Sequence, residues 1–556
     1  MFRWNKRVCF FQGLLAVVGF SVVLTAANVA PVFGEEASLQ FSEVCGEGDA
    51  SEVRGLSVCP SWEREVVGHP HTLAELEDLR VRLSLALHTA GYVFAQVEFP
   101  SEKWADGILV ARVDCGHLGE FHVRRAGRYY TPRQVIAKLS GRSPDFNYAE
   151  FCRRLSSLNA GDCKVDVTLK PVYRGGRLAV DAEVDYTDCL PLHGSLEVRN
   201  TAAPEAKSSV RLRLGMQAQN LARCDDTLAL YYVTNGDVGG EVNAGYGTYR
   251  LPMGEQWVWT AFGSWSDSTY SEVVRGLDIQ GRGSSYGLQL ERELYADGRI
   301  RATVALGWRV ARTRNRLRLF SQALELGSTT VSMPYLTLGY SEGGLDGWNG
   351  CNFATLTFTG GRSGVWGASG EKAFRAEGRG ADGTFWQTRM AAARLQRLFT
   401  GEECPGRWSL LLRLQGLYTN EAAPNATREY LGGYESVRGY QEAEVSGDSL
   451  LAGTLELRVP LMEHRPEERS FDWLPRGRLV GIFFTDFGWV TSHGDDNQPE
   501  NGRRRHQHLV SAGAGVRLGL GKGLQTAIDY ALPLNRHASP DTPAHGRWHF
   551  ALSLQF

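Results

Sequence analysis

The sequence predicts an α+β N-terminal region followed by an all-β transmembrane barrel of about sixteen antiparallel strands. Three observations support this fold class. From residue 190 onward, apolar and polar residues alternate in segments of about 10–13 residues, the length that a tilted strand needs to cross a bilayer. After the first 34 residues, no segment supplies the roughly 20 apolar residues of a membrane helix. Residues 50–187 instead combine helical and strand patterns with helix-capping signatures.

The first 34 residues have the features of an export signal. A basic start precedes an apolar run over residues 8–30, and Val32 and Gly34 offer a cleavage site. An uncleaved membrane anchor is the alternative. Removing residues 1–34 takes away three basic and no acidic groups, which lowers the formal net charge from −2 to −5. This charge is not a signature of nucleic-acid binding, so no nucleic-acid partner is expected.

Residues 51–187 are predicted to form two similar modules, 51–117 and 118–187, after a short segment at 35–50. Thr72 and Glu75 form a capping box, and the apolar face of the following helix ends at Gly91. In the second module, Thr131 and Gln134 have the same spacing at the start of another helix. Short alternating strands complete both modules, although the opening half of the first is poorly defined.

The barrel prediction depends on period-two alternation. In the final segment Trp548, Phe550 and Phe556 share one face, whereas His549 and Gln555 share the other. A soluble sandwich also alternates, but its strands average about 5–6 residues. Sixteen segments fit the barrel pattern: 191–200, 208–220, 226–235, 241–251, 255–267, 283–294, 299–312, 331–341, 351–360, 386–399, 406–419, 449–461, 477–490, 508–520, 523–534 and 547–556.

The connections between these segments alternate in length. Long loops outside and short turns inside are expected of an outer-membrane barrel, and an even strand number places both termini of the barrel chain on the inner, periplasmic side. The stretch 462–476 departs from this alternation, which leaves a strand boundary there open. The predicted long loops are 268–282, 313–330, 361–385, 420–448 and 491–507.

Nine cysteines follow the export signal, and such a number suits an oxidising compartment. None has CxxC spacing, and no metal site or cofactor is expected. Cys115 is left over from the hypothetical pairing, which sequence alone does not determine. The proposed disulfides are Cys45–Cys59, Cys152–Cys163, Cys189–Cys224 and Cys351–Cys404.

Two short motifs are candidates for a functional contact. The longest loop, between the eleventh and twelfth segments, carries Arg438, and the thirteenth segment carries Asp486. If the loop folds back into the barrel, a guanidinium and a carboxylate form a bidentate, charge-assisted contact. A solvated arginine and a separate barrel aspartate are the alternative. The motif residues are Val437, Arg438, Gly439 and Tyr440 in the loop, and Phe484, Asp486 and Gly488 in the strand.

The order of parts and both motifs resemble the two-partner secretion transporters (TpsB type, the haemolysin secretion/activation protein family) of the outer-membrane POTRA-barrel superfamily. Members carry periplasmic polypeptide-transport-associated (POTRA) domains before a sixteen-stranded barrel. Residues 91–123 resemble the junction between two POTRA domains, and the resemblance covers about residues 50–556. It implies that Arg438 pairs with Asp486 and stabilises a tucked loop that secretion needs.

The resemblance also implies the function and location. We expect a pore in the outer membrane of a Gram-negative-type bacterium, with the POTRA domains in the periplasm. It would export an unfolded partner polypeptide, bound through POTRA strand edges, to the cell surface. Outer-membrane lipid and the barrel-assembly machinery would be the other partners, with Trp548, Phe550 and Phe556 as the insertion signal. The alternatives are a barrel-assembly factor of the same superfamily and a passive porin.

Two further features bear on these expectations. Family members usually begin with an amphipathic plug helix, but residues 35–50 are too short and polar for one. The loop alone would then close the resting pore, or the pore would leak. Residues 283–287 match a nucleophile elbow, but they lie in a predicted strand without hydrolase context. No enzymatic activity is therefore expected.

Overall fold

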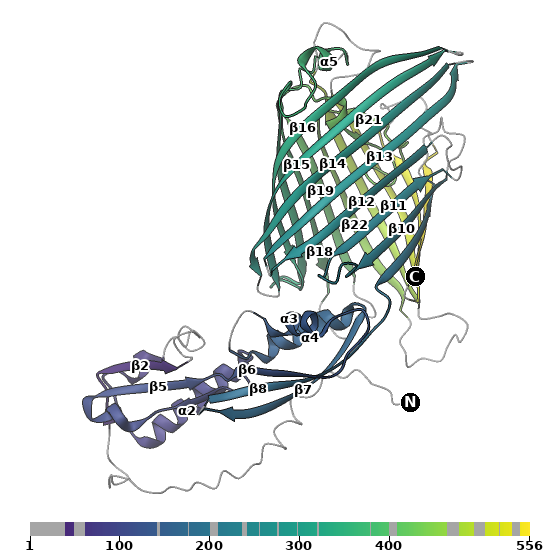
Figure 1. Ribbon diagram of the computed structural model, residues 1–556. Helices are drawn as coiled ribbons and strands as arrows, with labels where there is room; N and C mark the ends of the chain where they lie inside the picture. The colour runs from purple at the N-terminus through teal and green to yellow at the C-terminus, as the bar shows by residue number, and fades with distance from the viewer. Residues whose placement is uncertain are drawn as a thin grey trace. The chain divides into compact units, whose positions relative to one another are not determined.

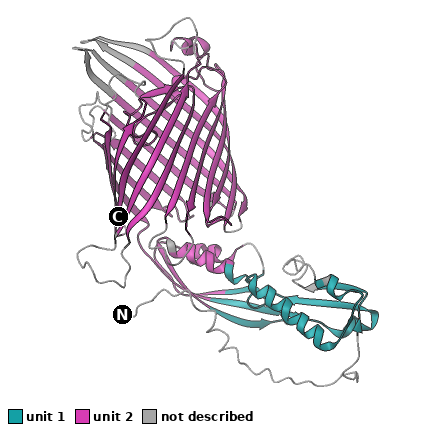
Figure 2. Cartoon of the chain, turned by 180° about the vertical axis from the view of Figure 1, so that it is seen from behind, with its two compact units in different colours: residues 1–120, 142–149, 169–182 teal, residues 121–141, 150–168, 183–556 magenta. Residues whose placement is uncertain are grey.

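The chain folds into two compact units in the computed structural model. They comprise residues 1–120, 142–149 and 169–182, and residues 121–141, 150–168 and 183–556 (Figure 2). No helix among the described residues is long and apolar enough to cross a membrane. The structure describes residues 39–48, 62–141, 145–175, 177–200, 210–235, 242–254, 256–274, 277–296, 299–319, 322–377, 380–399, 408–463, 477–493, 506–521, 523–535 and 545–556.

The first module is a three-stranded sheet covered by one long helix. The apolar face of the helix α2 is buried through Leu76, Leu79, Leu83 and Leu87 against the sheet residues Val97 and Leu109, among others. The sheet order is β2-β5-β4, with β2 parallel to β5 and β4 antiparallel to it. The elements are β1 (Leu39–Gln40), β2 (Glu43–Gly48), α1 (Trp62–Val66), β3 (Pro70–His71), α2 (Leu73–Thr89), β4 (Gln96–Glu98), η3 (Ser101–Asp106) and β5 (Ile108–Asp114).

The second sheet has the order β6-β8-β7 and is accompanied by two helices (Figure 1). The carboxylate of Asp188, at the end of β8, accepts hydrogen bonds from the main-chain N–H groups of Arg128, Tyr129 and Tyr130 at 2.7–2.8 Å. This contact fixes the segment that leads into α3. The elements are β6 (His117–Arg125), α3 (Pro132–Ser140), α4 (Tyr148–Ala160), β7 (Cys163–Arg174) and β8 (Arg177–Asp188).

Both capping boxes recognised in the sequence are present. The Glu75 N–H donates to Thr72 Oγ1 at 3.2 Å, and the Thr72 N–H donates to Glu75 Oε2 at 2.8 Å. Thr131 and Gln134 make the reciprocal pair at the start of α3. The strand β2 begins at Glu43, within the segment 35–50. The first sheet therefore includes residues that precede residue 51, where the first module was expected to begin.

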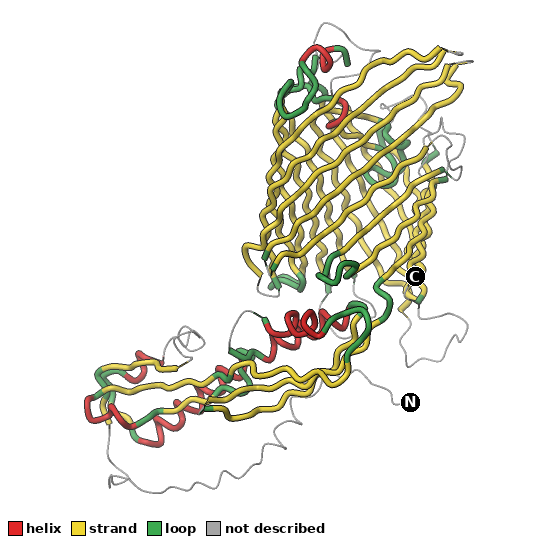
Figure 3. The backbone as a smooth tube through the Cα atoms, in the orientation of Figure 1, coloured by secondary structure: helices red, strands yellow, loops and turns green. Residues whose placement is uncertain are grey.

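Sixteen antiparallel strands close into a barrel, which confirms the predicted fold class and strand number (Figures 1 and 3). Every predicted segment overlaps a strand. Beside the stretch 462–476, one strand ends at Glu463, two residues later than predicted, and the next begins at Gly477 as predicted. The strands are β9 (Leu192–Arg199), β10 (Arg211–Gln219), β11 (Thr227–Thr234), β12 (Val242–Met253), β13 (Trp257–Val274), β14 (Leu277–Ala296), β15 (Ile300–Leu319), β16 (Gln322–Glu342), β17 (Gly350–Gly361), β18 (Phe385–Arg397), β19 (Ser409–Thr419), β22 (Ser449–Glu463), β23 (Gly477–Thr491), β24 (His506–Leu520), β25 (Leu524–Pro533) and β26 (Arg547–Gln555).

Two of the predicted long loops are wrong. Residues 268–282 and 313–330 mostly continue the strands β13–β16, which are 18–21 residues long and extend toward the end of the barrel where the long connections lie, here called the outer end (Figure 1). About 9–11 residues suffice to cross a bilayer. Beyond the membrane neither face of a strand meets lipid, so the alternation that predicted the inner parts is not required there.

A loop covers the edge that this extension creates. The pairing of β16 with β17 reaches Tyr335, whereas β16 continues outward. There the Ser369 N–H donates to the carbonyl oxygen of Thr330 at 2.9 Å. Trp366 packs edge-on against Trp308, and Phe374 of α5 (Glu371–Arg375) is fully buried. The loop thus supplies hydrogen-bond partners to a strand edge that would otherwise be open to other chains.

The predicted disulfides are not formed between the described cysteines. Cys152, Cys163, Cys189 and Cys224 are free thiols, which corrects both pairings that involve them. Cys189 Sγ lies 3.4 Å from the Asp162 carbonyl oxygen, and Cys224 Sγ lies 3.4 Å from Asp226 Oδ1, so each of these thiols has its own acceptor. Cys45 and Cys351 are also thiols, and their predicted partners Cys59 and Cys404 lie outside the described residues.

Thiol labelling of the folded protein at about pH 8 tests this arrangement. Cys163 is 2% exposed, and burial raises the pKa of its thiol to about 11, so a maleimide should leave it unmodified. The exposed Cys189 and Cys224 should react without a reductant. Denatured protein, in which Cys163 reacts, is the control. Protection of Cys189 and Cys224 that disappears only on reduction would restore the predicted disulfide.

Candidate functional site

The loop between β19 and β22 enters the barrel lumen. Within it, η4 (Asn425–Thr427) precedes a small hairpin of β20 (Glu429–Leu431) and β21 (Val445–Gly447). The tip of the loop is almost entirely excluded from solvent: Val437 and Tyr440 are 0% exposed and Arg438 is 6% exposed. A loop tip that is buried to this extent must satisfy its polar groups with partners inside the barrel.

Glycines allow the loop to turn tightly beside the barrel wall. Gly432, Gly433 and Gly439 have φ values of 117°, 89° and 90°, which favour glycine. A Cβ atom on Gly432 would lie 2.2 Å from the carbonyl oxygen of Gln441, and one on Gly439 would lie 3.1 Å from that of Ala531. Substitution at these positions would therefore displace the loop.

Arg438 forms a bidentate ion pair with Asp486 of β23. Its Nε donates to Asp486 Oδ2 at 2.7 Å, and its Nη2 donates to Oδ1 at 2.9 Å. The main-chain N–H of Arg438 donates to the same carboxylate at 3.1 Å. Asp486 has no exposed surface, and the guanidinium carbon lies 3.3 Å from the centroid of the Phe484 ring. This contact combines charge, fork geometry and stacking, for which arginine is suited and lysine is not.

Two further carboxylates complete the environment of the guanidinium. Arg438 Nη1 lies 3.2 Å from Asp529 Oδ2 of β25 and 3.4 Å from Glu456 Oε2 of β22. Each of these acids also meets a second arginine: Arg517 Nη2 donates to Asp529 at 2.8 Å, and Arg458 Nε donates to Glu456 at 2.8 Å. Three arginines thus balance three carboxylates, which reduces the cost of burying the charges.

The rest of the tip is held by main-chain and apolar contacts. The Gly439 N–H donates to His549 Nε2 of β26 at 3.0 Å, so this nitrogen carries no proton. The Tyr440 hydroxyl lies 2.9 and 2.7 Å from the carbonyl oxygens of Val510 and Asn535. Val437 packs in an apolar cluster of buried residues: Leu417, Leu431, Tyr440, Val445, Leu450, Ala452, Val490 and Leu509.

The comparisons with known proteins decide the family. The chain matches the family model described as haemolysin secretion/activation protein ShlB/FhaC/HecB over residues 180–518. It belongs to this family. No curated protein matches it. Among solved structures it is similar to CdiB from Escherichia coli, with a TM-score of 0.72 at 17% identity over 96% of this chain and 93% of that one.

Two more structures share the fold of this ShlB/FhaC/HecB family member. CdiB from Acinetobacter baumannii has a TM-score of 0.69 at 14% identity, over 94% of this chain and 91% of that one. BamA from Haemophilus ducreyi lacking POTRA domains 1–3 has a TM-score of 0.50 at 14% identity, over 94% and 100%. The fold is therefore that of α+β POTRA domains followed by an outer-membrane barrel.

The structure brings the two predicted motifs of this family member into direct contact. Phe484 stacks on the guanidinium, Asp486 pairs with it, and Gly488 leaves room for the loop. A Cβ atom at Gly488 would lie 2.9 Å from Val437 Cγ2 and 2.8 Å from Leu431 Cδ1. Each motif residue of β23 therefore has a physical role in seating the loop.

The C-terminal residues lie on the outer face of the barrel. Trp548, Phe550 and Phe556 are 63%, 38% and 75% exposed, whereas His549 between the first two is buried. The N–H and carbonyl of Phe556 pair with Gly194 of β9 at 3.0 and 2.8 Å. The terminal residue thus extends the seam where β26 meets β9. Recognition of these residues as an insertion signal stays a prediction.

Sequence reasoning missed Glu456, Asp529 and His549, all of which contact the loop tip. Their only signal is a polar residue on the lumenal side of an alternating strand. Many lumenal positions in the chain share that property. Only the strand register shows which of them lie level with Arg438.

Replacing Arg438 should release the loop. The change Arg438→Ala leaves Asp486, Glu456 and Asp529 together without their shared cation, and breaking a buried pair costs about 3–5 kcal/mol. Amide exchange of residues 437–440, measured by mass spectrometry on the folded barrel, should accelerate at least about a hundredfold. Arg438→Lys should recover only part of the protection because lysine lacks the planar fork. Unchanged exchange in Arg438→Ala would show that the ion pairs do not hold the loop.

The contact with His549 gives a separate prediction. His549→Phe removes the acceptor of the Gly439 N–H, and a buried donor left without a partner costs about 1–3 kcal/mol. Exchange of that one amide should accelerate about tenfold. His549→Gln, whose side-chain oxygen also accepts, is the matched control and should retain protection. Equal exchange in the two variants would exclude a role for the hydrogen bond.

Proposed function

We propose that the protein exports a partner polypeptide across the outer membrane, from the periplasm to the cell surface. The observation that carries this proposal is the buried loop: a barrel of the ShlB/FhaC/HecB family holds Arg438 and its neighbours inside its lumen through ion pairs. A passive pore gains nothing from a loop that obstructs its own lumen and is held there by buried ion pairs, whereas a gated conduit needs an obstruction that can be displaced.

The orientation follows from the placement of the long connections. The outer end carries the long strands β13–β16 and the loop between β19 and β22, and we assign it to the cell surface. The POTRA domains then lie in the periplasm, together with the first residues of β9 and the last residues of β26. A client in the periplasm would thus meet the POTRA domains before the pore.

The POTRA sheets offer strand edges for an unfolded client. In the sheet β6-β8-β7 the outermost strands are β6 and β7, and in β2-β5-β4 they are β2 and β4. An extended polypeptide can add to such an edge through main-chain hydrogen bonds, which do not depend on its sequence. This mode of binding suits a client that must stay unfolded until it has passed the lumen.

The lumenal wall is polar, as export of an unfolded chain requires. Four arginines occupy lumenal positions of their strands: Arg199, Arg213, Arg309 and Arg389. Glu197 forms ion pairs with Arg199 and Arg213. A polar chain can exchange hydrogen bonds along such a wall without a deep apolar trap. No energy source is invoked: folding of the client outside would make passage directional.

The test compares surface-exposed and released proteins in strains with and without this gene. We expect loss of one large protein, and the same loss in an Arg438→Ala strain whose barrel remains in the membrane. Arg413→Ala is the matched control, because this arginine of β19 forms no ion pair among the described residues. It should secrete normally.

Two other outcomes would contradict export. A broad decrease of many outer-membrane barrels in the deletion strain would identify a barrel-assembly factor of the same superfamily. An unchanged protein profile, combined with altered permeability to small solutes, would identify a passive porin.

A further inference from the structure

The outer face of the barrel can be identified from the strand register. Arg199 of β9 contacts Glu435 of the tucked loop, so its side chain points into the lumen. Its cross-strand neighbour Arg211 shares that face. Because side chains alternate along a strand, Leu214 and Met216 of β10 point outward, and both are more than 40% exposed.

The strand register shows which side chains of the neighbouring strands also point outward, because directly paired residues place their side chains on the same face of the sheet. We call the row that contains Leu214 the groove row, and the next row toward the outer end the headgroup row. The groove row consists of Leu214, Tyr232, Gly245, Trp265, Ser284 and Arg312. The headgroup row includes Asp267, Arg282 and Arg314.

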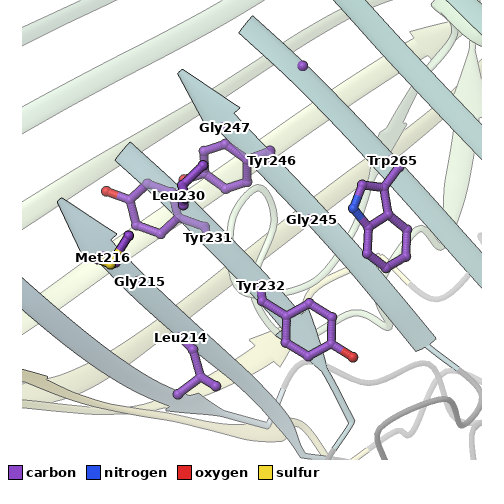
Figure 4. Close-up of a pocket in the computed structure, with 11 residues that line it drawn as sticks. Leu214, Gly215, Met216, Leu230, Tyr231, Tyr232, Gly245, Tyr246, Gly247 and Trp265 are labelled. Atoms are coloured by element: carbon purple, nitrogen blue, oxygen red, sulfur yellow. The ribbon is translucent and has the colours of Figure 1, made fainter. Parts of the chain in front are cut away.

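An apolar groove of about 540 Å³ lies on this outer face (Figure 4). Gly245 and Gly247 of β12 and Gly263 of β13, which lack side chains, line its floor. Leu214 and Trp265 flank it on opposite sides, and the indole lies over Gly245, 2.6 Å from where a Cβ would be. Elsewhere on a lipid-facing wall, side chains would fill such a space.

Beside and beyond the groove, positive charge accumulates. Arg282 Nε pairs with Asp267 Oδ2 at 2.8 Å, yet Arg314 lies directly opposite Arg282 on the next strand. Like charges in directly opposed positions are destabilising unless an anion lies between them. Nε of Arg314 is buried without a hydrogen-bond partner among the described residues. Arg312 Nε donates a hydrogen bond to the hydroxyl of Ser328 at 3.4 Å.

The level of these arginines corresponds to lipid headgroups. Trp265 and Tyr286 point outward at 49% and 59% exposure, as aromatic residues do in the girdle at a membrane surface. Arg282 and Arg314 lie in the row beyond Trp265, toward the outer end.

We propose that this sector binds one phosphorylated lipid of the outer leaflet, with an acyl chain in the glycine groove and a phosphate between Arg282, Arg312 and Arg314. Phosphate accepts bidentate hydrogen bonds from guanidinium groups and would supply an anionic partner for Arg312 and Arg314. The groove opens to the hydrocarbon layer, which favours a lipid over a polypeptide as its occupant. The inference depends on the membrane placement of the barrel and is independent of export.

The experiment measures lipid binding to the full-length protein by native mass spectrometry in a lipid-free detergent. Bis-phosphorylated lipid A is the probe. Each basic side chain near an anionic lipid contributes about a fivefold change in affinity, so Arg312→Gln with Arg314→Gln should weaken binding about 25-fold. Enzymatically dephosphorylated lipid A should bind the wild-type protein with a similarly reduced affinity. Inorganic phosphate should not displace the lipid.

Matched variants separate the two parts of the site. Arg292→Gln removes an arginine of the same strand as Arg282 that packs on Trp257 at 5.2 Å, and should bind lipid A like wild type. Gly263→Leu places a side chain in the groove, where a Cβ meets only the Ser285 oxygen at 3.9 Å. It should weaken binding although every arginine remains. Heat-modifiable migration on gels verifies that each variant forms a barrel.

Three results would overturn the proposal. The first is undiminished binding of lipid A by the Arg312→Gln, Arg314→Gln variant. The second is binding of dephosphorylated lipid A with the same affinity as the phosphorylated form. The third is displacement of the lipid by an acidic polypeptide such as polyglutamate. The last would assign the arginines to a protein partner. Undiminished binding by Gly263→Leu would refute the groove as the acyl-chain site.

Discussion

The structure of the lumen depends on one buried guanidinium. Removing an arginine and an aspartate from water costs several kcal/mol for each charge, and their attraction offsets this cost only when the geometry is good and the remaining donors are satisfied. Arg438 meets this condition because it pairs with Asp486 through two hydrogen bonds and because its Nη1 donates to both Glu456 and Asp529. The polar cluster is neutral as a whole, so the loop can lie inside the barrel without an uncompensated charge.

The same cluster makes the position of the loop specific. An apolar loop could slide along the wall, but a fork of hydrogen bonds to three different strands defines one register. Glycines then permit the close approach that these distances need: Gly488 accommodates Val437, and Gly439 lies against the Ala531 main chain. For a conduit, this arrangement is an obstruction held by discrete polar contacts, and exchange of these contacts for others would release it.

The outside of the barrel is governed by a different constraint. In hydrocarbon, side chains gain by covering the wall with apolar surface, and charged groups are confined to the ends of the strands. The four strands β13–β16 continue beyond that limit, and their edge at Thr330 is covered by the loop that carries Ser369. Where the apolar face ends, arginines appear at once on β14 and β15. Along one row of paired residues the side chains change from glycine and tryptophan to arginine, and we place the membrane surface at this change.

The sequence by itself determined the elements that repeat a local pattern. Alternation located all sixteen strands, Thr72 and Thr131 located two helix starts, and the motif residues Arg438 and Asp486 could be paired through the family resemblance. These predictions are correct because the constraints behind them act on residues that are close in sequence. A strand with one face in lipid requires alternating apolar residues, and the unsatisfied N–H groups at a helix start require a nearby capping side chain.

Only the tertiary structure decided the rest. The extension of β13–β16 was invisible because strands in water need no alternation. Glu456, Asp529 and His549 could not be selected, since their nearness to Arg438 follows from barrel closure and strand register over up to 111 positions of sequence separation. Thiol positions likewise depend on the packing of distant segments, which is why the predicted pairs Cys152–Cys163 and Cys189–Cys224 are free thiols instead of disulfides.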